Sequence, residues 1–288
     1  MPHLYYRIAE YSLLIDTPNA EKTAAALPSF FNFKSGASDD LLFRFSGGEA
    51  IPISDDMREE EVFDMENVFR SKSYKNSSGE RIVSLEIEGE EHFVHISSDL
   101  RAYRSDLDLT NPKQAAFLNI FLKLAFILSS APLKTIKMHA SVTEKDGKAL
   151  LFLGVSGTGK STHSSLWRKY VPGVTLLNDD EPIVRLLDDC SVRVYGAPWS
   201  GGTACYRNVS ANISAFVHLH QSPENKLTKL NGREAFTSLF ISTHTLRTDS
   251  KIMNDVFNTV ADILEQKAVY RLDCRPDREA VSLTEQLM

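Results

Sequence analysis

The chain has 288 residues, in which 32 Lys and Arg are outnumbered by 38 Asp and Glu, for a net charge of −6. This acidic balance argues against nucleic acid or an anionic membrane as a partner. Apolar residues make up 42%, which is ordinary for a globular protein with a core. The three cysteines form no C-x-x-C pair, which indicates free, buried thiols in a reducing cytoplasm. Residues 1–16 lack a basic region followed by an uninterrupted apolar stretch, so no signal peptide is expected.

The first hundred residues predict a β-rich unit. Short runs of alternating or β-branched residues are broken by Gly, Asn, Asp and Ser, and they occupy residues 11–16, 40–47, 81–97 and 101–109. "NSSGE" at 76–80 and "EGEE" at 88–91 are typical of hairpin turns. The acidic stretch at 54–67 indicates a solvated face or a loop, not a ligand site.

Residues 112–129 predict a buried core helix. Pro112 follows Thr110 and Asn111, which suits a capped helix start with Pro in the first turn. Its most apolar part, "AAFLNIFLKLAFILSS" at 115–130, is too short for a membrane span and carries Asn119 and Lys123. Membrane insertion is therefore the weaker alternative.

After residue 130 the pattern changes to strands alternating with helices. Apolar or alternating runs predict strands at residues 148–154, 174–179, 191–198, 213–221 and 268–274. Periodic apolar residues predict helices at residues 160–171, 232–240, 251–266 and 277–287. The order predicts an α/β domain over residues 111–288 after a smaller β-rich domain over residues 1–110, mixed α+β overall.

"GVSGTGKST" matches the G-x-x-x-x-G-K-[ST] pattern of a phosphate-binding (P-loop, Walker A) sequence. Glycines allow backbone N–H groups to turn inward around phosphates, Lys160 supplies positive charge to the β- and γ-phosphates, and the Ser161 hydroxyl suits Mg²⁺. A strand precedes the loop and a helix follows it, which is the required context. The expected nucleotide-binding residues are Gly154, Ser156, Gly157, Thr158, Gly159, Lys160, Ser161 and Thr162.

"LLNDDEPIV" ends an apolar strand in Asp179 and Asp180. Open α/β sheets bind ligands at the C-terminal ends of their strands. One carboxylate there can hold a metal ion, directly or through water, and the second can accept a proton from an attacking hydroxyl. An ordinary Asp-Asp turn is the alternative, and the nearby phosphate loop favours the functional interpretation.

The segment "MHASV", followed by the loop and by "LLNDDE", resembles the nucleotide core of ATP-dependent phosphoenolpyruvate carboxykinases. It also resembles HPr kinase/phosphorylase, which has a His at a similar upstream place and ends its acidic strand in Asp-Asp. The resemblance covers residues 133–184, and it implies a P-loop nucleotide domain that uses ATP with divalent ions. The carboxykinase's arginine-rich substrate site and the glutamate-bearing signature segment of HPr kinase find no match.

Carried over by this resemblance, His139 would be a metal ligand or a polar group on the γ-phosphate side. Ser161 would hold Mg²⁺, Asp179 would be the general base that acts with Lys160 in catalysis, and Asp180 would be a metal ligand. A neutral imidazole with a carboxylate suits Mn²⁺ as well as Mg²⁺. Other histidines are expected to be structural: His163, His218, His220 and His244.

"PWSGG" is the best candidate for an acceptor or phosphate-closing loop. Ser200, Gly201 and Gly202 lie in it, and Arg207 follows with a positive charge that could face the transferring phosphoryl group. A tight turn followed by a surface arginine is equally compatible with the sequence.

Three functions remain open at this stage. The first is an ATP-dependent kinase that phosphorylates a hydroxyl of a protein, peptide or small molecule. The second is a non-catalytic ATP-binding accessory protein that recruits a partner. The third, a carboxykinase-related activity, is disfavoured by the short chain. Neither the acceptor nor the oligomeric state follows from the sequence.

Overall fold

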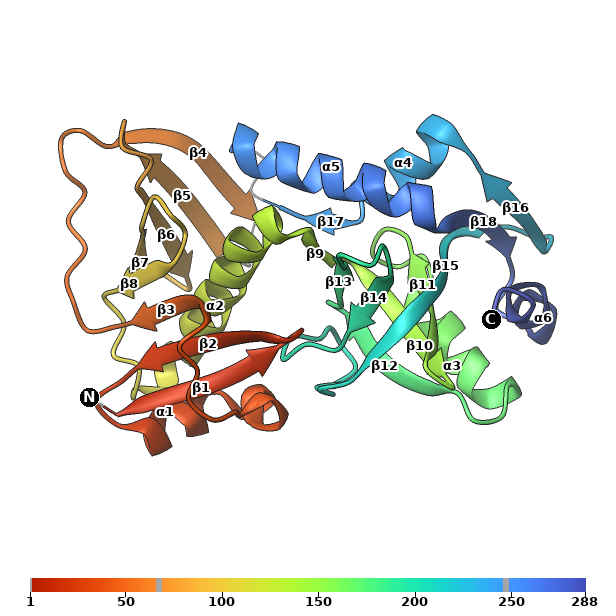
Figure 1. The fold of residues 1–288 in the computed structure, drawn as a ribbon, viewed down its shortest axis with the longest axis horizontal. Coiled ribbons are helices and arrows are strands. Elements are labelled where there is room, and N and C mark those ends of the chain that lie inside the picture. Colours follow the sequence, from red (N-terminus) through yellow and green to blue (C-terminus); the bar gives the residue numbers. More distant parts are fainter. Residues whose placement is uncertain (1, 66–68, 246–248) are drawn as a thin grey trace. The chain divides into compact units, whose positions relative to one another are not determined.

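The computed structural model describes residues 2–65, 69–245 and 249–288. The chain divides into two compact units, Met1–Ser129 and Ser130–Met288, and each is built on one large mixed β-sheet (Figure 1). The expected mixed α/β class is confirmed.

The sheet of the first unit has, within the described residues, eight strands in the order β1-β2-β3-β8-β7-β6-β5-β4. Strand β3 pairs in parallel with β2 and β8, and the other neighbours are antiparallel. The strands are β1 (His3–Ile8), β2 (Tyr11–Asp16), β3 (Leu41–Ser46), β4 (Arg58–Met65), β5 (Phe69–Lys75), β6 (Arg81–Ile87), β7 (Glu90–Ile96) and β8 (Ala102–Ser105). Helix α1 (Ala20–Ala26) and the 3₁₀ turn η1 (Pro28–Phe33) connect β2 to β3.

The acidic stretch at 54–67 forms strand β4 over most of its length, where a loop was one expectation. This strand lies at the edge of the sheet and pairs only with β5 among the described strands. Arg58 and Glu59 are exposed, because an edge strand tolerates charged side chains that a central strand would bury. Residues 66 and 67 of the stretch lie outside the described residues.

Helix α2 (Ala115–Ser130) follows the short 3₁₀ turn η2 (Pro112–Gln114), and the Asn111 side chain caps that turn as expected. The Tyr103 hydroxyl of β8 is hydrogen-bonded to the Ser129 hydroxyl (2.9 Å) and donates to the Ala125 carbonyl oxygen (3.3 Å). Phe126 is fully buried. The helix thus packs on the first sheet, and the boundary between the units follows it instead of preceding it at residue 110.

The helical segment of residues 112–133 is longer than the apolar segment read from the sequence, and by length and composition alone it could cross a membrane. Its most apolar 18-residue window has a mean hydropathy of 1.7. Slightly more than half of the most apolar window, 56%, is buried inside the protein. The contacts of this segment with Tyr103 are those of a helix in a protein core.

The second unit has, among the described residues, a ten-stranded sheet in which eight strands follow the order β12-β10-β11-β15-β14-β13-β9-β17, while β18 pairs with β15 and β16. Its strands are β9 (Thr135–Met138), β10 (Ala140–Lys145), β11 (Lys148–Leu153), β12 (Thr175–Asp180), β13 (Ile183–Leu186), β14 (Val192–Tyr195), β15 (Ser210–Gln221), β16 (Lys226–Leu230), β17 (Thr243–His244) and β18 (Ala268–Cys274). Its helices are α3 (Lys160–Tyr170), α4 (Gly232–Phe240), α5 (Ser250–Gln266) and α6 (Arg278–Glu285), and a 3₁₀ turn η3 (Ala131–Leu133) begins the unit.

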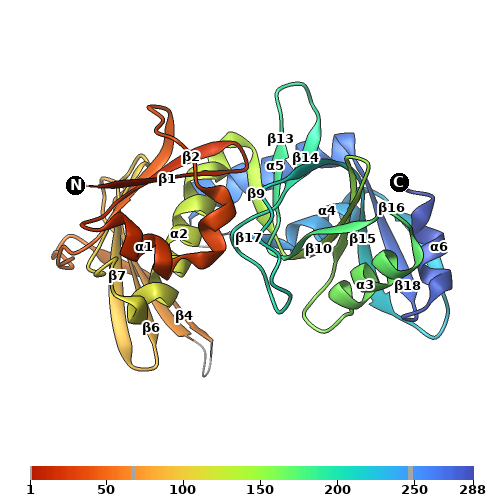
Figure 2. The same cartoon turned by 90° about the horizontal axis from the view of Figure 1, so that it is seen from below.

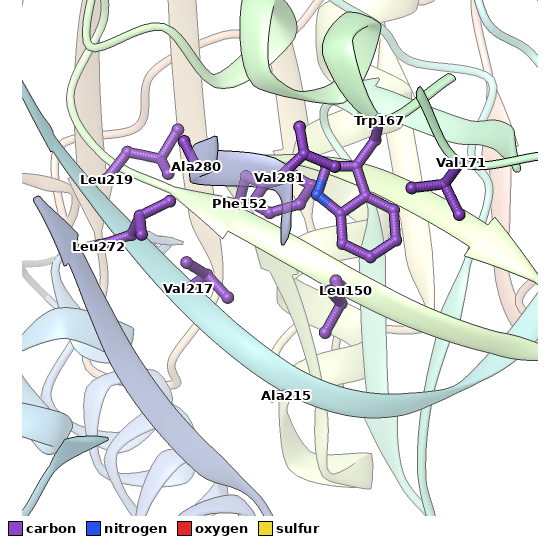
Figure 3. Close-up of a cluster of buried hydrophobic side chains, with 10 residues drawn as sticks. All are labelled: Leu150, Phe152, Trp167, Val171, Ala215, Val217, Leu219, Leu272, Ala280 and Val281. Carbon is purple, nitrogen blue, oxygen red and sulfur yellow. The ribbon is translucent and has the colours of Figure 1, made fainter. Parts of the chain in front are cut away.

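Helices cover both faces of this sheet (Figure 2). Alternate side chains of a strand point to opposite faces. Leu150 of β11 and Val217 of β15 pack with Trp167 of α3 and Val281 of α6 in the core cluster of Figure 3. His218, the residue after Val217, is hydrogen-bonded to Ser238 of α4 on the other face (2.8 Å). The sheet is therefore a central layer that holds the ends of its strands in fixed positions.

Six of the described strands of this sheet run in the same direction: β11, β12, β13, β15, β17 and β18, of which four matter for the site. Strands β15 and β18 are parallel to β11, and β12 has the same direction because β10 is antiparallel to both β11 and β12. The C-terminal ends of these strands therefore lie along one edge of the sheet. The short strands β9, β10 and β13 were not predicted from the sequence. Segments such as "ASVTEK" mix small, polar and charged residues and so lack the apolar or alternating pattern of a strand.

His163 is a structural histidine of the core, as expected, and its burial makes the stability of the protein depend on pH. Its side chain is 3% exposed, and its ring packs edge-on against Phe152 with centroids 4.6 Å apart. Burial lowers the pKa of His163 to about 4. Between pH 6.5 and 4 the unfolded chain therefore binds a proton at this position that the folded chain does not, so stability falls as the pH falls through this window.

We expect His163→Leu to lose less stability on acidification than the wild type. The drop in its free energy of unfolding between pH 7 and pH 4 should be smaller by up to about 3 kcal/mol. Urea denaturation across this range measures it. Ile241→Leu, which changes an exposed apolar side chain and removes no titratable group, is the control and should keep the pH profile of the wild type. A profile of His163→Leu parallel to that of the wild type would contradict the assignment.

Candidate functional site

Strand register brings His139 to the loop that follows β11. Ala140, the first residue of β10, pairs with Leu153 at the end of β11 on one side and with Asp180 at the end of β12 on the other. His139 precedes Ala140 and donates its backbone N–H to the Ser242 carbonyl oxygen (2.7 Å). One side chain from the start of β10 is thereby placed between the loop and the acidic strand end.

The loop from Gly154 to Gly159 connects β11 to α3. Gly159 is the N-cap of α3 and has a φ of 101°, a left-handed conformation that glycine adopts without the steric cost of a side chain. The first backbone N–H groups of a helix have no partner within the helix and form an electropositive end. Ser156 and Gly157 are exposed, so the loop presents its backbone to solvent.

Lys160 is 7% exposed, and its ammonium group lies inside the loop. It donates to the carbonyl oxygens of Gly154 (2.9 Å) and Val155 (3.3 Å) and contacts the Nε2 atom of His139 (2.8 Å). Burial lowers the pKa of Lys160, and the negative charges of Asp180 and Asp179 oppose this effect. The lysine is thus held by loop carbonyls and an imidazole, within the field of two carboxylates.

His139 links Lys160 to Asp180. The Nδ1 atom of His139 lies 2.9 Å from Oδ1 of Asp180. Because an ammonium group has only donors, the Nε2 atom of His139 accepts from Lys160 and the ring proton sits on Nδ1. The hydrogen bond from His139 is the main reason that the pKa of Asp180 is lowered. A neutral imidazole therefore bridges a cation and an anion.

The second carboxylate has a different partner. The Ser161 hydroxyl donates to Oδ1 of Asp179 (3.0 Å), and Asp179 is 2% exposed. Asp180 is more accessible, with 34% of its side chain exposed. The neighbouring aspartates thus point to different parts of the site: Asp179 faces Ser161 at the start of α3, and Asp180 faces His139.

The backbone turns sharply at Asp180, which has a φ of 86°. Such a conformation is strained for a residue with a side chain, and strained residues are concentrated at functional sites. The turn is supported by the segment after β14. Gly201 donates its N–H to the Asp179 carbonyl oxygen (2.9 Å), and a Cβ atom at Gly201 would lie 2.7 Å from the Cβ of Asp180. Only glycine fits there without displacement.

The predicted loop of Ser200 to Gly202 is thus partly brought to the site. The Ser200 hydroxyl lies within hydrogen-bond distance of the carbonyl oxygens of Asp179 (2.9 Å) and Thr203 (2.6 Å) and shares its one proton between them, so it supports the strand end. A Cβ atom at Gly202 would meet no atom within 4 Å.

Arg207 is not brought to the site. Its guanidinium group donates to the Thr175 hydroxyl (3.0 Å) and the Leu176 carbonyl oxygen (2.6 Å) at the beginning of β12. Four residues of strand, about 13 Å, separate Leu176 from Asp180. Arg207 therefore fastens its own segment to β12, and a role on the transferring phosphoryl group is not supported.

Two groups around the acidic strand end escaped sequence analysis. Asn178 is fully buried, and its amide donates to the Trp199 carbonyl oxygen (3.0 Å) and accepts from the Glu181 N–H (3.0 Å). Lys137, whose side chain is also fully buried, forms an ion pair with Glu181 (3.0 Å). The sequence contained one sign of this ion pair, which is the position of Lys137 between Ile136 and Met138. The residues next to it do not indicate that Glu181 is its partner.

The arrangement fits a triphosphate with a divalent cation. Two carboxylates beside the loop would repel phosphates unless a cation lay between them, and oxygens are the ligands that Mg²⁺ prefers. The Ser161 and Asp179 oxygens, 3.0 Å apart, are such a pair. Within the described ranges, no group of three or more His, Cys, Asp or Glu side chains could hold a metal ion.

Comparison with solved structures finds a similarity to the Hpr(Ser) kinase/phosphatase from Coxiella burnetii, with 12% sequence identity and a TM-score of 0.32. The match covers 52% of this chain and 87% of that one. No protein-family model matches the chain, and neither does any curated protein.

Proposed function

We propose that this protein is an ATP-dependent phosphotransferase of the HPr kinase-like kind that moves a γ-phosphoryl group to a hydroxyl. One observation carries the proposal. Lys160, His139 and Asp180 form a hydrogen-bonded chain beside the loop, and the Ser161–Asp179 pair lies at the start of α3. A phosphate-binding loop, a cationic side chain and two carboxylates with different surroundings are the parts that phosphoryl transfer requires.

Binding of ATP would use groups that the loop already presents. Backbone N–H groups of the loop and of the first turn of α3 would hold the phosphates. Lys160 would exchange its contacts with the Gly154 and Val155 carbonyl oxygens for contacts with phosphate oxygens. Ser161 and Asp179 would hold Mg²⁺ or Mn²⁺, which when bound neutralises phosphate charge.

The geometry favours an assignment of the two aspartates opposite to the one expected from sequence. Asp179 shares a hydrogen bond with Ser161, the residue expected to hold the metal, so it suits the metal side. Asp180 is more exposed and faces His139, so it suits the general base. Both nitrogens of His139 are engaged in contacts, which favours a proton-holding role for this residue over a metal-ligand role.

In the proposed step, the acceptor oxygen forms a bond to the γ-phosphorus while the bond from phosphorus to the β–γ bridging oxygen breaks. The electron pair of the broken bond stays on ADP. The acceptor hydroxyl gives its proton to Asp180, and His139 stabilises the carboxylate before this transfer through the Nδ1–H bond. Lys160 balances the negative charge that develops on the phosphates.

The acceptor is proposed to be a hydroxyl of a protein, a peptide or a small molecule. It would approach Asp180 past Gly202, around which there is open space. Gly201 keeps the backbone close to the carboxylate, so that an acceptor does not meet a side chain at this position. These two glycines leave a path along which an acceptor can reach Asp180. A screen of proteins, peptides and metabolites with labelled ATP would identify the acceptor.

Lys160→Ala should weaken ATP binding at least tenfold, about 1.4 kcal/mol, because it removes the charge that faces the phosphates. Titration calorimetry with ATP and Mg²⁺ measures this. Lys169→Ala, a change in the same helix at an exposed position, is the matched control and should bind like the wild type. Unchanged ATP binding by Lys160→Ala would refute the nucleotide site.

Asp180→Asn should leave ATP affinity within a few-fold and lower turnover by about 10²–10⁴-fold, because a general base contributes that much to proton transfer. Asp179→Asn should instead weaken ATP binding in the presence of Mg²⁺. Slow ATP hydrolysis, with water in the place of the acceptor, is the assay until an acceptor is known.

The opposite pattern, with loss of binding in Asp180→Asn alone, would restore the assignment expected from sequence. A wild-type protein that binds ATP but neither hydrolyses nor transfers its phosphoryl group with any divalent metal would be a nucleotide-binding accessory protein instead.

A further inference from the structure

Lys137 is a buried cation that the proposed mechanism does not use. It lies in β9, two residues before His139, and its side chain is fully buried. Lysine is almost never fully buried in a folded protein unless its charge is paired. Exchange of such a pair for apolar side chains often leaves stability unchanged, so stability alone does not account for a charge at this position.

The partner of Lys137 comes from the turn that carries Asp180. The ammonium group lies 3.0 Å from Oε2 of Glu181, the residue directly after Asp180, and the Glu181 side chain is 13% exposed. His139 directly follows β9, and Asp180 directly precedes Glu181. The ion pair therefore joins the segment that carries the histidine to the segment that carries its carboxylate partner.

Backbone pairing supports the same junction. The Met138 N–H donates to the Pro182 carbonyl oxygen (3.0 Å), and Lys137 pairs with Ile183 at the start of β13. After Asp180 the chain therefore turns back and runs antiparallel to β9. Within this junction, Glu181 is the residue next to Asp180, so its contact with Lys137 acts closest to the strained turn.

A third segment meets Lys137. Its ammonium group lies 6.0 Å from the centre of the Trp199 ring, within range of a cation–π interaction, and Trp199 is buried. Trp199 precedes Ser200 and Gly201, which contact the Asp179 carbonyl oxygen. The charge of Lys137 thus lies where three segments meet: the end of β9, the turn after β12, and the segment that supports this turn.

The proposed reaction depends on the relative placement of these segments. The Nδ1 atom of His139 and Oδ1 of Asp180 are 2.9 Å apart, and general-base catalysis requires hydrogen-bond distances of this order. The φ of 86° at Asp180 is unfavourable for a residue with a side chain, so the turn persists only where its surroundings hold it. Loss of the ion pair would allow the turn to relax and the carboxylate to move away from His139.

We infer that Lys137 is a positioning residue for phosphoryl transfer: through Glu181 it holds the Asp180 carboxylate at His139 and at the place of the acceptor hydroxyl. The inference rests on the proposed function. A fully buried side chain cannot touch ATP or the acceptor, so Lys137 acts through the turn and not on the reacting atoms. Its removal should slow turnover and leave nucleotide binding, which uses the loop and Lys160, nearly unchanged.

Lys137→Met/Glu181→Leu tests this inference, because it replaces the ion pair by apolar side chains of similar size. We expect the variant to fold, with a midpoint of urea unfolding close to that of the wild type. Its ATP hydrolysis should be about 10²-fold slower, since apolar contacts do not fix the direction of a carboxylate and a displacement of about 1 Å can cost this much. ATP affinity, measured by titration calorimetry, should stay within a few-fold of the wild type.

The first unit supplies a matched control. Arg81 is 3% exposed and forms an ion pair with Glu60 (3.1 Å). Arg81→Met/Glu60→Leu removes this pair by the same kind of replacement, in a sheet that carries none of the residues of the cluster. It should keep the turnover and the ATP affinity of the wild type. Lys137→Met carries the test if the double variant fails to fold, because Glu181 is partly exposed and can be solvated.

A second measurement needs neither nucleotide nor turnover. In protein labelled with ¹⁵N-histidine, the Nδ1–H proton of His139 should give a downfield NMR signal, because a carboxylate accepts its hydrogen bond. Absence of this signal in His139→Gln identifies it. We expect the signal in the wild type and in the Arg81→Met/Glu60→Leu control, and its loss or an upfield shift in Lys137→Met/Glu181→Leu.

The outcomes distinguish this inference from the proposed function. Unchanged turnover or an unchanged His139 signal in Lys137→Met/Glu181→Leu would overturn the positioning role and leave the proposed function standing. An equal loss of turnover in the control, or a fall in ATP affinity as large as the fall in turnover, would also overturn it. A wild-type protein that binds ATP without turnover would refute the proposed function, and with it any role of Lys137 in the transfer.

Discussion

Strand β10 is hydrogen-bonded on one side to the strand that leads into the loop and on the other to the strand that ends in the two aspartates. The arrangement of the site depends on this double register. Ala140 pairs with both Leu153 and Asp180, so a slip of one residue on either side would move His139 away from Lys160 or from Asp180. The helices on both faces of the sheet bury these strands and thereby fix the register.

Within this frame, each buried charge has a partner of the opposite sign or a polar neighbour. Lys160 is held by carbonyl oxygens and by the neutral ring of His139, and Asp180 receives the proton-bearing nitrogen of the same ring. Lys137 is paired with Glu181 under the turn that carries Asp180. Burial of an unpaired charge would cost several kcal/mol, so these pairings explain how buried and half-buried charged groups can gather in one site. They also hold the strained backbone at Asp180.

The loop has chemically different surroundings on its two sides. On one side of the loop lie the charged groups Lys160, Asp179 and Asp180, and on the other lies a pocket lined mainly by apolar and small polar side chains together with Arg275. A ligand with a charged end and a flat, uncharged end would be oriented by this difference. The turn of α3 produces it, because residues at consecutive positions of a helix point about 100° apart.

Local sequence patterns were enough to predict the loop, the helix after it and the acidic strand end, because each of these features depends on neighbouring residues. Glycine conformational freedom, apolar periodicity and paired aspartates are local signals, and they also identified the core helix at residues 112–129. The sequence did not show which aspartate faces Ser161. The two aspartates are adjacent and chemically identical, and the directions of their side chains follow from the backbone turn at Asp180. The sequence also left unknown that Arg207 binds the start of β12 and that Lys137 pairs with Glu181. These contacts could be seen only in the folded protein. They join segments that are far apart along the chain, and the sequence does not show which distant segments come together in space.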